Sequence, residues 1–451
     1  MYISLILAAG EGKRMRSDIP KVLHEVNFKP LVKWVLDATN DAEKQIVIIG
    51  HMAEKVKERL GESVSYAMQE QQLGTGHAVM QAREYLEGLD GIDGSVVVIS
   101  GDTPLITKET LEAAFAYHKS SNNTATVLTS HVENPAGYGR VIRNFSGNVT
   151  KIVEHKDANA DELIITEINS GIYFFDIASL LSTLDKITSN NAQGEYYLTD
   201  TIEILISENK KVGAFIVGDN NEILGINDRI QLAQASEIMR KRITTMHMHN
   251  GVTFISPETA YIGSDVKIGR DTIIMPNTIL EGNSVIAENC IIGPNSRIVD
   301  STIANGVEVN NSVILQSEVG SDTHIGPFSY VRPNSKIGKN IKIGDFVEIK
   351  NSVIDDGTKV SHLTYIGDAD VGKNVNFGCG TIIVNYDGDK KYRSTIHDDS
   401  FIGCNSNLVS PVTINKGAFI AAGSTITDDV PDNALAIARS RQTTKTNWKK
   451  K

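Results

Sequence analysis

Residues 262–299 have the sequence IGSDVKIGRDTIIMPNTILEGNSVIAENCIIGPNSRIV, and this stretch decides the fold of the C-terminal half. An aliphatic side chain returns in it at every sixth position: Ile262, Ile268, Ile274, Leu280, Ile286, Ile292 and Ile298. A period of six fits neither an α-helix nor a sheet built from hairpins. It predicts a triangular coil in which each hexad supplies one short strand and one turn, so that three hexads complete a circuit.

The same spacing continues toward the C-terminus after a slip of phase through residues 300–324. The later hexads begin at Ile325, Val331, Ile337, Ile343, Ile349, Val360, Ile366, Val371, Phe377, Ile402, Leu408, Ile414, Ile420 and Ile426. After Val384 the period breaks for about twenty residues, which we interpret as a loop that leaves the coil and shapes a binding site. A narrow interior filled by Ile and Val also explains why aromatic residues make up only 6% of the chain.

Upstream of the repeats, short apolar runs alternate with helical patterns. We expect strands at Ser4–Ala9, Gln45–Gly50, Ser95–Ser100, Ala125–Ser130 and Gly171–Phe175, and helices at Pro30–Asn40, His77–Leu86 and Lys108–Lys119. This alternation predicts an α/β domain with a mainly parallel sheet. From Asn227 to about His249 neither Pro nor Gly interrupts the chain, which predicts one long helix. The expected domains are therefore 1–226, a linker helix 227–250, and 251–451.

Composition excludes several classes of protein. The 451 residues carry 44 basic and 55 acidic side chains, a formal charge of −11, which argues against a protein that coats nucleic acid. The three cysteines, Cys290, Cys379 and Cys404, have no CxxC spacing, so neither a zinc site nor a disulfide framework is expected. They favour a reducing compartment, and we expect a cytoplasmic protein. Apolar runs are too short for a membrane span.

A glycine-rich turn follows the first expected strand. Gly10 and Gly12 allow backbone N–H groups to approach a phosphate, and Arg14 and Lys21 supply positive charge. On glycine spacing alone, a plain strand-to-helix turn with exposed basic residues is an equally good interpretation. In the same way Asp102, which follows a buried strand, is by itself more typical of a helix cap than of a functional carboxylate.

The segment Leu7–Met15, LAAGEGKRM, followed by Lys21 in a Pro-Lys-Val-Leu context, resembles the sugar-nucleotide pyrophosphorylases. Further matching segments occur in the family's order at 69–78, 100–105, 137–140, 153–156, 167–171 and 225–228. Together with the hexads, the chain resembles over essentially its whole length the bacterial bifunctional N-acetylglucosamine-1-phosphate uridyltransferase/glucosamine-1-phosphate N-acetyltransferases. This resemblance implies a Rossmann-like nucleotide-diphospho-sugar transferase domain joined by a long α-helix to a left-handed parallel β-helix.

The resemblance also implies roles for residues of the N-terminal half. The residues that would bind UTP and UDP-N-acetylglucosamine are Leu7, Ala8, Ala9, Gly10, Lys21, Gln69, Gln72, Gly74, Thr75, Ser100, Gly101, Asp102, Gly139, Glu154, Asn169 and Asn227. Asp102 and Asn227 would hold Mg²⁺, whose preferred ligands are oxygens. Arg14 and Lys21 would stabilise phosphate oxygens during catalysis. Position 13 is Lys where the family usually has Thr, which alters the charge of the phosphate loop.

For the C-terminal half, His362 is the expected general base, because an unperturbed imidazole titrates near neutrality. The resemblance implies that Arg332, Lys350, Tyr365 and Asn376 bind glucosamine 1-phosphate. It implies that Cys379, Asn385, Tyr386, Cys404, Ala422 and Arg439 bind acetyl-CoA. Cys379 and Cys404 replace the Ala and Ser usual there; a nucleophilic cysteine is conceivable, but direct attack of the amine on the thioester does not need one.

The implied reactions are acetyl transfer from acetyl-CoA to glucosamine 1-phosphate, then uridylyl transfer from UTP to N-acetylglucosamine 1-phosphate with release of pyrophosphate. The family's β-helices trimerise side by side with acetyl-CoA between subunits, so a homotrimer is also implied. Two alternatives remain from the residues. One is a nucleotidyltransferase whose repeats only assemble it, and the other is a scaffold with a degenerate N-terminal domain.

Overall fold

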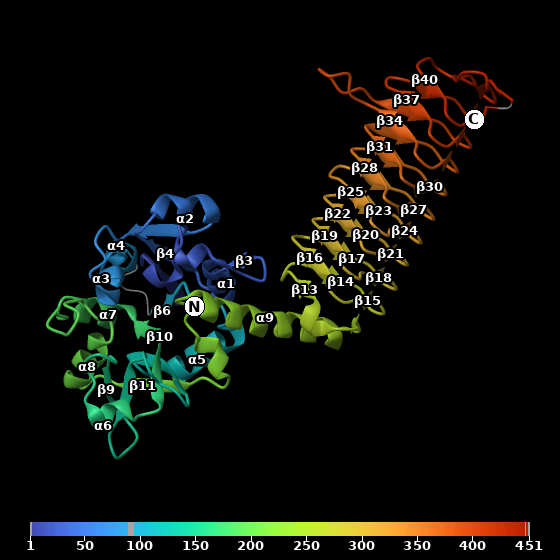
Figure 1. Ribbon diagram of the computed structural model, residues 1–451. Helices are drawn as coiled ribbons and strands as arrows, with labels where there is room; N and C mark the ends of the chain where they lie inside the picture. The colour runs from blue at the N-terminus through green and yellow to red at the C-terminus, as the bar shows by residue number, and fades with distance from the viewer. Residues whose placement is uncertain (1, 89–93, 447, 450–451) are drawn as a thin grey trace. The chain divides into compact units, whose positions relative to one another are not determined.

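The structure is a computed structural model that describes residues 2–88, 94–446 and 448–449 (Figure 1). The chain divides into two compact units, Met1–Met239 and Arg240–Lys451. The long helix expected near residue 227 is present as α9, Arg229–His249. Among the described residues, no helix is both long and apolar enough to span a membrane.

A twisted sheet forms the centre of the first unit. Its strands follow the order β11, β7, β10, β6, β1, β4, β5, and all neighbours are parallel except β10, which is antiparallel to both of its neighbours. The bounds are β1 Tyr2–Ala8, β4 Lys44–Ile49, β5 Ser65–Met68, β6 Ser95–Ser100, β7 Ala125–His131, β10 Glu167–Asp176 and β11 Val212–Ile216. The expected mainly parallel sheet is confirmed.

Several elements escaped prediction because their sequences carry no clear pattern. The edge strands β5 and β11 are only partly buried, and a small antiparallel hairpin is formed by β8, Arg140–Arg143, and β9, Val149–Val153. The single helix expected at His77–Leu86 is wrong. The chain forms α3, Thr75–Met80, and α4, Arg83–Glu87, because the N–H of Ala82 bonds to the carbonyl of Val79, one residue closer than in an α-helix.

Helices cover both faces of this sheet. The other helices of the unit are α1 Leu31–Ala38, α2 Ala53–Leu60, α5 Lys108–Ser120, α6 Ala160–Leu163, α7 Ile177–Leu184 and α8 Asp200–Ser207, with one-turn 3₁₀ segments η1 Lys13–Met15, η2 Lys21–Leu23 and η3 Asn220–Ile223. A minor two-stranded sheet joins β2, Glu25–Val26, and β3, Lys29–Pro30. Burial alternates along β6, where Val96 and Val98 belong to one core and Val97 and Ile99 to the other.

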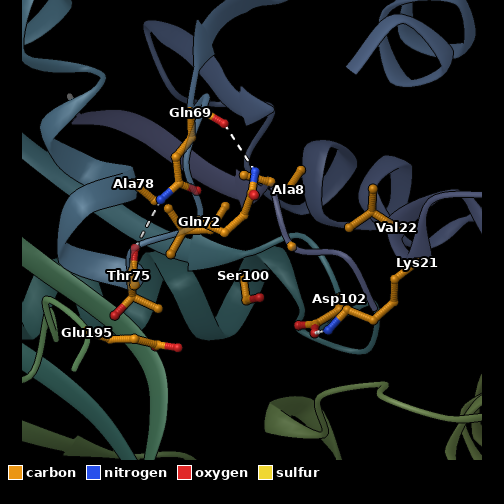
Figure 2. A pocket seen from close by; sticks show the side chains of 14 residues that line it. Ala8, Lys21, Val22, Gln69, Gln72, Thr75, Ala78, Ser100, Asp102 and Glu195 are labelled. Atoms are coloured by element: carbon orange, nitrogen blue, oxygen red, sulfur yellow. Dashed lines mark hydrogen bonds and ion pairs between the residues drawn. The ribbon is translucent and has the colours of Figure 1, made fainter. Parts of the chain in front are cut away.

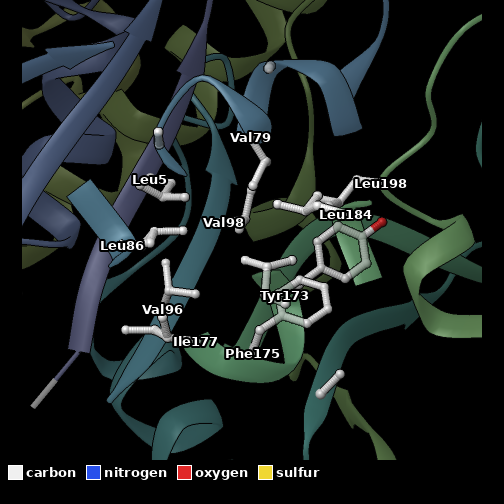
Figure 3. Close-up of a cluster of buried hydrophobic side chains, with 14 of the residues drawn as sticks. Leu5, Val79, Leu86, Val96, Val98, Tyr173, Phe175, Ile177, Leu184 and Leu198 are labelled. Atoms are coloured by element: carbon white, nitrogen blue, oxygen red, sulfur yellow. The ribbon is translucent and has the colours of Figure 1, made fainter. Parts of the chain in front are cut away.

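Figure 3 shows the first of these cores, in which strand residues such as Leu5 and Val98 pack beside Leu86, Leu184 and Phe175. All five side chains are at most a few per cent exposed. The sheet is therefore anchored from both faces, and the loops at the carboxyl ends of β1 and β6 are held in fixed positions.

The second unit is a left-handed parallel β-helix with three sheets, which Figure 1 shows as three stacked ladders. The first sheet contains β12 Thr253–Phe254, β15 Ile273–Ile274, β18 Ile291–Ile292, β21 Glu308–Val309, β24 His324–Ile325, β27 Lys342–Asp345, β30 Lys359–His362, β33 Asn376–Phe377, β36 Phe401–Ile402, β39 Phe419–Ile420 and β41 Leu435–Ala436.

The second sheet contains β13 Tyr261–Ile262, β16 Ile279–Glu281, β19 Arg297–Val299, β22 Val313–Leu315, β25 Tyr330–Val331, β28 Glu348–Lys350, β31 Tyr365–Gly367, β34 Ile382–Val384, β37 Asn407–Val409 and β40 Thr425–Ile426. The third contains β14 Lys267–Ile268, β17 Val285–Ile286, β20 Thr302–Ile303, β23 Glu318–Val319, β26 Lys336–Ile337, β29 Val353–Ile354, β32 Ala369–Val371, β35 Ser394–Ile396 and β38 Thr413–Ile414. A 3₁₀ turn, η4 Pro257–Thr259, precedes β13.

Each aliphatic residue of the hexads stacks on its equivalent in the next coil. Ile274 pairs with Ile292, eighteen residues later, and both are fully buried. The phase slip arises from shorter coils, since Ile298 pairs with Ile314 after only sixteen residues. The triangular coil with three hexads per circuit is confirmed.

The loop that leaves the coil is shorter than expected. The broken period suggested about twenty residues, but β34 and β35 both remain in register with their neighbours. Only residues 385–393 leave the coil. The sequence pattern hid β35 because the insertion shifts the phase of the hexads that follow it.

Candidate functional sites

The glycine-rich turn after β1 packs closely against Lys21 at Gly12. Gly12 has a φ of 62°, and a Cβ at this position would lie 2.6 Å from Cβ of Lys21. A side chain here is therefore excluded by both backbone strain and contact. This close approach brings η1, which carries Arg14, against η2, which carries Lys21.

A cavity of about 240 Å³ opens at the carboxyl ends of β1 and β6 (Figure 2). Eleven of the residues expected to bind nucleotide line it: Leu7, Ala8, Ala9, Gly10, Lys21, Gln69, Gln72, Gly74, Thr75, Ser100 and Asp102. A second cavity of about 490 Å³ shares Lys21 and Gln72 with the first, and Arg14 and Asn227 also line it. The structure thus brings these predicted residues together from five separate segments of the chain.

The Lys21 ammonium is the centre of this arrangement. It contacts the carboxylate of Asp102 and donates to Oδ1 of Asn227 over 3.1 Å. The N–H of Ile226 donates to the carbonyl of Asp102 over 2.9 Å, which fixes the segment before α9 beside the end of β6. Two acceptor oxygens from distant parts of the sequence therefore face one positive charge.

The segment expected to read the nucleotide base is held by internal hydrogen bonds. Nε2 of Gln69 donates to the carbonyl of Gly74 over 3.1 Å, and Nε2 of Gln72 donates to the carbonyl of Gln69 over 3.3 Å. The hydroxyl of Thr75 accepts from the N–H of Leu198 over 3.1 Å. These bonds leave a fixed edge of amide groups toward the cavity in Figure 2.

Gly139, Glu154 and Asn169 form a separate group that does not line the first cavity. The N–H of Asn169 donates to the carbonyl of Gly139 over 2.9 Å, and a Cβ on Gly139 would lie 3.6 Å from Oε1 of Glu154. Burial raises the pKa of the Glu154 carboxyl, and the negative charges of Asp157 and Asp200 raise it further. Gly101 also lies outside the lining, and its N–H donates to the carbonyl of Leu7 over 2.9 Å.

Sequence reasoning missed Glu195, which lines both cavities. The neighbouring backbone packs on Gly74, where a Cβ would lie 2.5 Å from the carbonyl oxygen of Tyr196. Nothing in the surrounding sequence distinguishes Glu195 from an ordinary loop glutamate. Only the tertiary packing of this loop on Gly74 identifies it.

In the second unit, Nδ1 of His362 lies 2.6 Å from Oδ1 of Asp345. The two residues are register partners on adjacent strands of the first sheet, β27 and β30. The hydrogen bond to His362 lowers the pKa of the Asp345 carboxyl. Asp345 therefore orients the imidazole through Nδ1, and Nε2 is the ring nitrogen that this contact does not engage.

A second group is centred on Asp368, which follows β31 in the second sheet. Its carboxylate accepts from Nζ of Lys350 over 2.8 Å, from Nδ2 of Asn351 over 2.6 Å, and from Nδ2 of Asn385. Burial acts to raise the pKa of Asp368, but these hydrogen bonds outweigh it and the net shift is downward. The hydroxyl of Tyr365 accepts from Asn385 over 3.4 Å.

The remaining predicted sugar-phosphate residues are divided between sheets. Arg332 follows β25 in the second sheet and pairs with Glu348 over 2.9 Å. Asn376, in contrast, lies on β33 of the first sheet, between Lys359 and Phe401. Within one chain the structure therefore brings Lys350, Asn385 and Tyr365 together but places Asn376 on another face.

The predicted acetyl-CoA residues mostly follow one corner of the prism. Cys379, Cys404 and Ala422 lie two positions after the buried residues Phe377, Ile402 and Ile420 of consecutive strands, the position that His362 and Asp345 occupy in earlier coils. Arg439 lies near the same corner. A Cβ built on Gly423, the residue after Ala422, would lie 4.0 Å from Cδ of Arg439. Tyr386 is exposed in the loop 385–393.

Asp345, Glu348 and Asp368 are functional candidates that the sequence analysis did not assign. A signal for them exists, because residues about one coil apart are neighbours. Asp345 precedes His362 by seventeen residues, and Asp368 follows Lys350 by eighteen. Counting one coil along the sequence from each predicted basic residue would have found the acidic residue that pairs with it.

The chain matches two protein-family models. The nucleotidyl transferase model matches residues 3–225, and the model of bacterial transferase hexapeptide repeats matches residues 265–300, 316–351 and 393–428.

Full-length relatives bear the name bifunctional protein GlmU. The protein from Acetivibrio thermocellus is 58% identical, with 99% of this chain and 96% of the relative covered. The protein from Caldanaerobacter subterraneus subsp. tengcongensis is 57% identical, with 99% and 97% covered. That from Clostridioides difficile is 53% identical, with 100% and 98% covered. With both domain types in one chain and this identity over its whole length, the protein belongs to the family of bifunctional GlmU enzymes, which carry a uridyltransferase and an acetyltransferase.

Proposed function

We propose that the cavity beside Lys21 is the uridyltransferase site and that the corner carrying His362 is the acetyltransferase site. The domain division would then be 1–226, a linker helix 227–250, and 251–451. Two observations carry this assignment. In one unit, Lys21 donates to oxygens of Asp102 and Asn227 at the strand ends, and in the other, His362 is oriented by Asp345.

In the first site, a phosphate oxygen of N-acetylglucosamine 1-phosphate attacks the α-phosphorus of UTP, and pyrophosphate leaves. Little covalent work falls to the protein, which must align the reactants and neutralise charge. Arg14 and Lys21 supply that charge, and Gln69, Gln72 and Thr75 hold the base. The group formed by Gly139, Glu154 and Asn169 would hold the sugar.

The residues fit a divalent cation of the Mg²⁺ type. A carboxylate from Asp102 and an amide oxygen from Asn227 both reach Lys21, so both oxygens face the same point. Such a sparse set of hard oxygen ligands suits Mg²⁺, which keeps several waters and also binds substrate phosphates. Mg²⁺ would neutralise phosphate charge there. The described residues contain no cluster of three or more His, Cys, Asp or Glu side chains suited to a metal.

In the second site, the amine of glucosamine 1-phosphate attacks the thioester carbon of acetyl-CoA. The C–N bond forms, the C–S bond breaks, and coenzyme A leaves as the thiolate. Nε2 of His362 takes the proton of the amine, because Nδ1 is engaged by Asp345. Arg332 and Lys350 suit the sugar phosphate, and Asn385 and Tyr386 would lie near the acetyl group.

A homotrimer is part of this proposal. Asn376 lies on a different sheet from Arg332, Lys350 and Tyr365, so one chain does not gather the four residues. Association of β-helices side by side would bring Asn376 of one copy to the second sheet of another. The free cysteines are compatible with a reducing compartment, and we place the enzyme in the cytoplasm.

A pair of single variants tests the assignment. Asp102→Ala should abolish pyrophosphate release from UTP and N-acetylglucosamine 1-phosphate, while free coenzyme A still forms from acetyl-CoA and glucosamine 1-phosphate. His362→Ala should do the reverse. Circular dichroism controls for folding. If either folded variant loses both activities, the assignment of two independent sites is wrong.

A further inference from the structure

Two of the three cysteines occupy equivalent positions in consecutive coils. Cys379 lies two residues after Phe377, and Cys404 lies two residues after Ile402. Phe377 and Ile402 are register partners in the parallel pair of β33 and β36. The inserted loop adds residues between the two cysteines in sequence, but it leaves from another corner and does not disturb this alignment.

Backbone hydrogen bonds hold the two cysteines side by side. The N–H of Gly378 donates to the carbonyl of Ile402 over 2.7 Å, and the N–H of Asn405 donates to the carbonyl of Cys379 over 2.7 Å. These two bonds bracket the pair, so the ladder continues through it. A Cβ built on Gly378 would lie only 2.8 Å from Cα of Cys404, which shows how closely the two turns pack.

This spacing suits a disulfide. Equivalent residues on neighbouring strands have Cα atoms about 4.8 Å apart, and disulfides join Cα atoms at about 4.4–6.8 Å. The side chains must lean toward each other, and glycines on either side of Cys379 and before Cys404 give the turns freedom to adjust. Cys404 is exposed and Cys379 is partly exposed, whereas Cys290 is buried.

We propose that Cys379 and Cys404 form an oxidisable dithiol, and that its conversion to an intrachain disulfide by a peroxide suppresses acetyl transfer. The suppression rests on the proposed function, in which the corner that carries His362, and also Cys379 and Cys404, is the acetyltransferase site. The dithiol itself rests only on the register of β33 and β36. Cys290 takes no part, because it lies at a different position of an earlier coil.

The reaction balances with hydrogen peroxide as the oxidant. The thiolate of the exposed Cys404 attacks one oxygen of the peroxide, forming a sulfenic acid and releasing hydroxide. The thiolate of Cys379 then attacks that sulfur, forming the S–S bond and releasing a second hydroxide. The two hydroxides combine with the two thiol protons to give two waters. Both sulfurs are oxidised, and the peroxide oxygens are reduced.

The disulfide would alter the wall that acetyl-CoA meets. Two separate thiols would be replaced by one rigid bridge across consecutive turns, and the turns themselves would move. The uridyltransferase cavity contains neither cysteine, so its activity should not change. The uridyltransferase activity of the same oxidised sample therefore serves as an internal control.

The test treats the full-length protein with hydrogen peroxide. The thiol count of the denatured chain should fall from three to one. Trypsin should then release a linked pair of peptides, 374–390 joined to 394–416, that dithiothreitol separates. Acetyl transfer should fall by about tenfold or more and recover with dithiothreitol, while uridylyl transfer stays constant.

Two variants complete the experiment. Cys290→Ser should still form the linked peptides and lose acetyl transfer on oxidation, whereas Cys404→Ser should form no link and show no peroxide-dependent loss relative to its own reduced sample. Absence of the linked peptides, or a link between two chains on a non-reducing gel, would overturn the dithiol. If the link forms but the reduced enzyme transfers no acetyl group, the proposed function fails while the dithiol stands. If the link forms and acetyl transfer is unaffected, its suppressing role is wrong.

Discussion

Asp345 and His362 are stacked one coil apart in the β-helix and joined by a hydrogen bond of 2.6 Å between Oδ1 and Nδ1. The β-helix contains a second pair of the same kind, in which Nδ1 of His324 lies 3.0 Å from Oε2 of Glu308. Only the first pair lies at the corner that continues into Cys379 and Cys404. Such pairs therefore form more than once in the stacked coils, and we propose a functional role only for Asp345 and His362.

We expect Asp345→Ala to lower kcat for acetyl transfer by about tenfold or more, because the imidazole loses the partner that orients it. KM for glucosamine 1-phosphate should change little, since Asp345 would not touch the substrate. Steady-state kinetics of coenzyme A release measure both constants. The matched control is Glu308→Ala, which removes the carboxylate of the other pair and should leave both constants unchanged. Equal losses in the two variants would contradict a positioning role for Asp345.

Asp368→Ala should impair acetyl transfer through substrate binding. Its carboxylate holds Lys350, Asn351 and Asn385 at once, and removing it frees three side chains from a fixed arrangement. We expect KM for glucosamine 1-phosphate to rise by about fivefold or more, with uridylyl transfer unchanged. The control is Glu318→Ala, which breaks an exposed pair with Lys336 on the third sheet. A normal KM in Asp368→Ala would contradict the role of this cluster.

The β-helix could be predicted from the sequence because its signal is local and repeated. Each hexad places one buried aliphatic residue, so Ile274 and Ile292 identify the coil without knowledge of any contact. The inserted loop was harder to delimit, since its length shifts the phase and conceals β35. The carboxylates Asp345 and Asp368 are polar residues at corners, where the pattern sets no residue type, and only coil counting connects them to their partners.

The site of the first unit depended far more on resemblance. Asp102 and Asn227 are more than a hundred residues apart, and no periodicity relates them. They meet because the segment before α9 bonds to the end of β6 through Ile226. Glu195 has no sequence signal at all, because its position depends on the packing of its loop against Gly74.

Lys21 and a divalent cation should compete for the same oxygens. The ammonium group contacts Asp102 and Asn227 in the structure, so a cation held by these two oxygens would take the place of the ammonium group. We expect Lys21→Met to raise the affinity for Mn²⁺ in the absence of nucleotide by about fivefold or more, because a positive charge beside the ligands is removed. Isothermal titration calorimetry measures this affinity. Uridylyl transfer should nevertheless fall.

The matched control for that variant is Lys57→Met, which removes a lysine paired with Glu54 on α2. Its affinity for Mn²⁺ should equal that of the unmodified protein. A weaker affinity in Lys21→Met would mean that the lysine supports cation binding instead of competing with it.

Asp200 should give the first unit a pH-dependent stability. Burial, together with the charges of Glu203 and Asp157, raises the pKa of its carboxyl from 3.8 to about 6. The folded state therefore holds this proton more tightly than the unfolded state. The contribution of this protonated carboxyl to the stability of the folded state is complete below pH 3.8 and is lost as the pH rises through about 6.

We therefore expect Asp200→Asn to raise the free energy of unfolding by about 1 kcal/mol more at pH 7.5 than at pH 4.5. This figure allows for the partial exposure of the carboxyl group. Urea unfolding followed by the fluorescence of Trp34, in a Trp448→Phe background, reports on the first unit alone, since the chain has two tryptophans. Asp161→Asn on the exposed helix α6 is the control and should show no such difference. An equal effect of Asp200→Asn at both pH values would contradict the raised pKa of the Asp200 carboxyl.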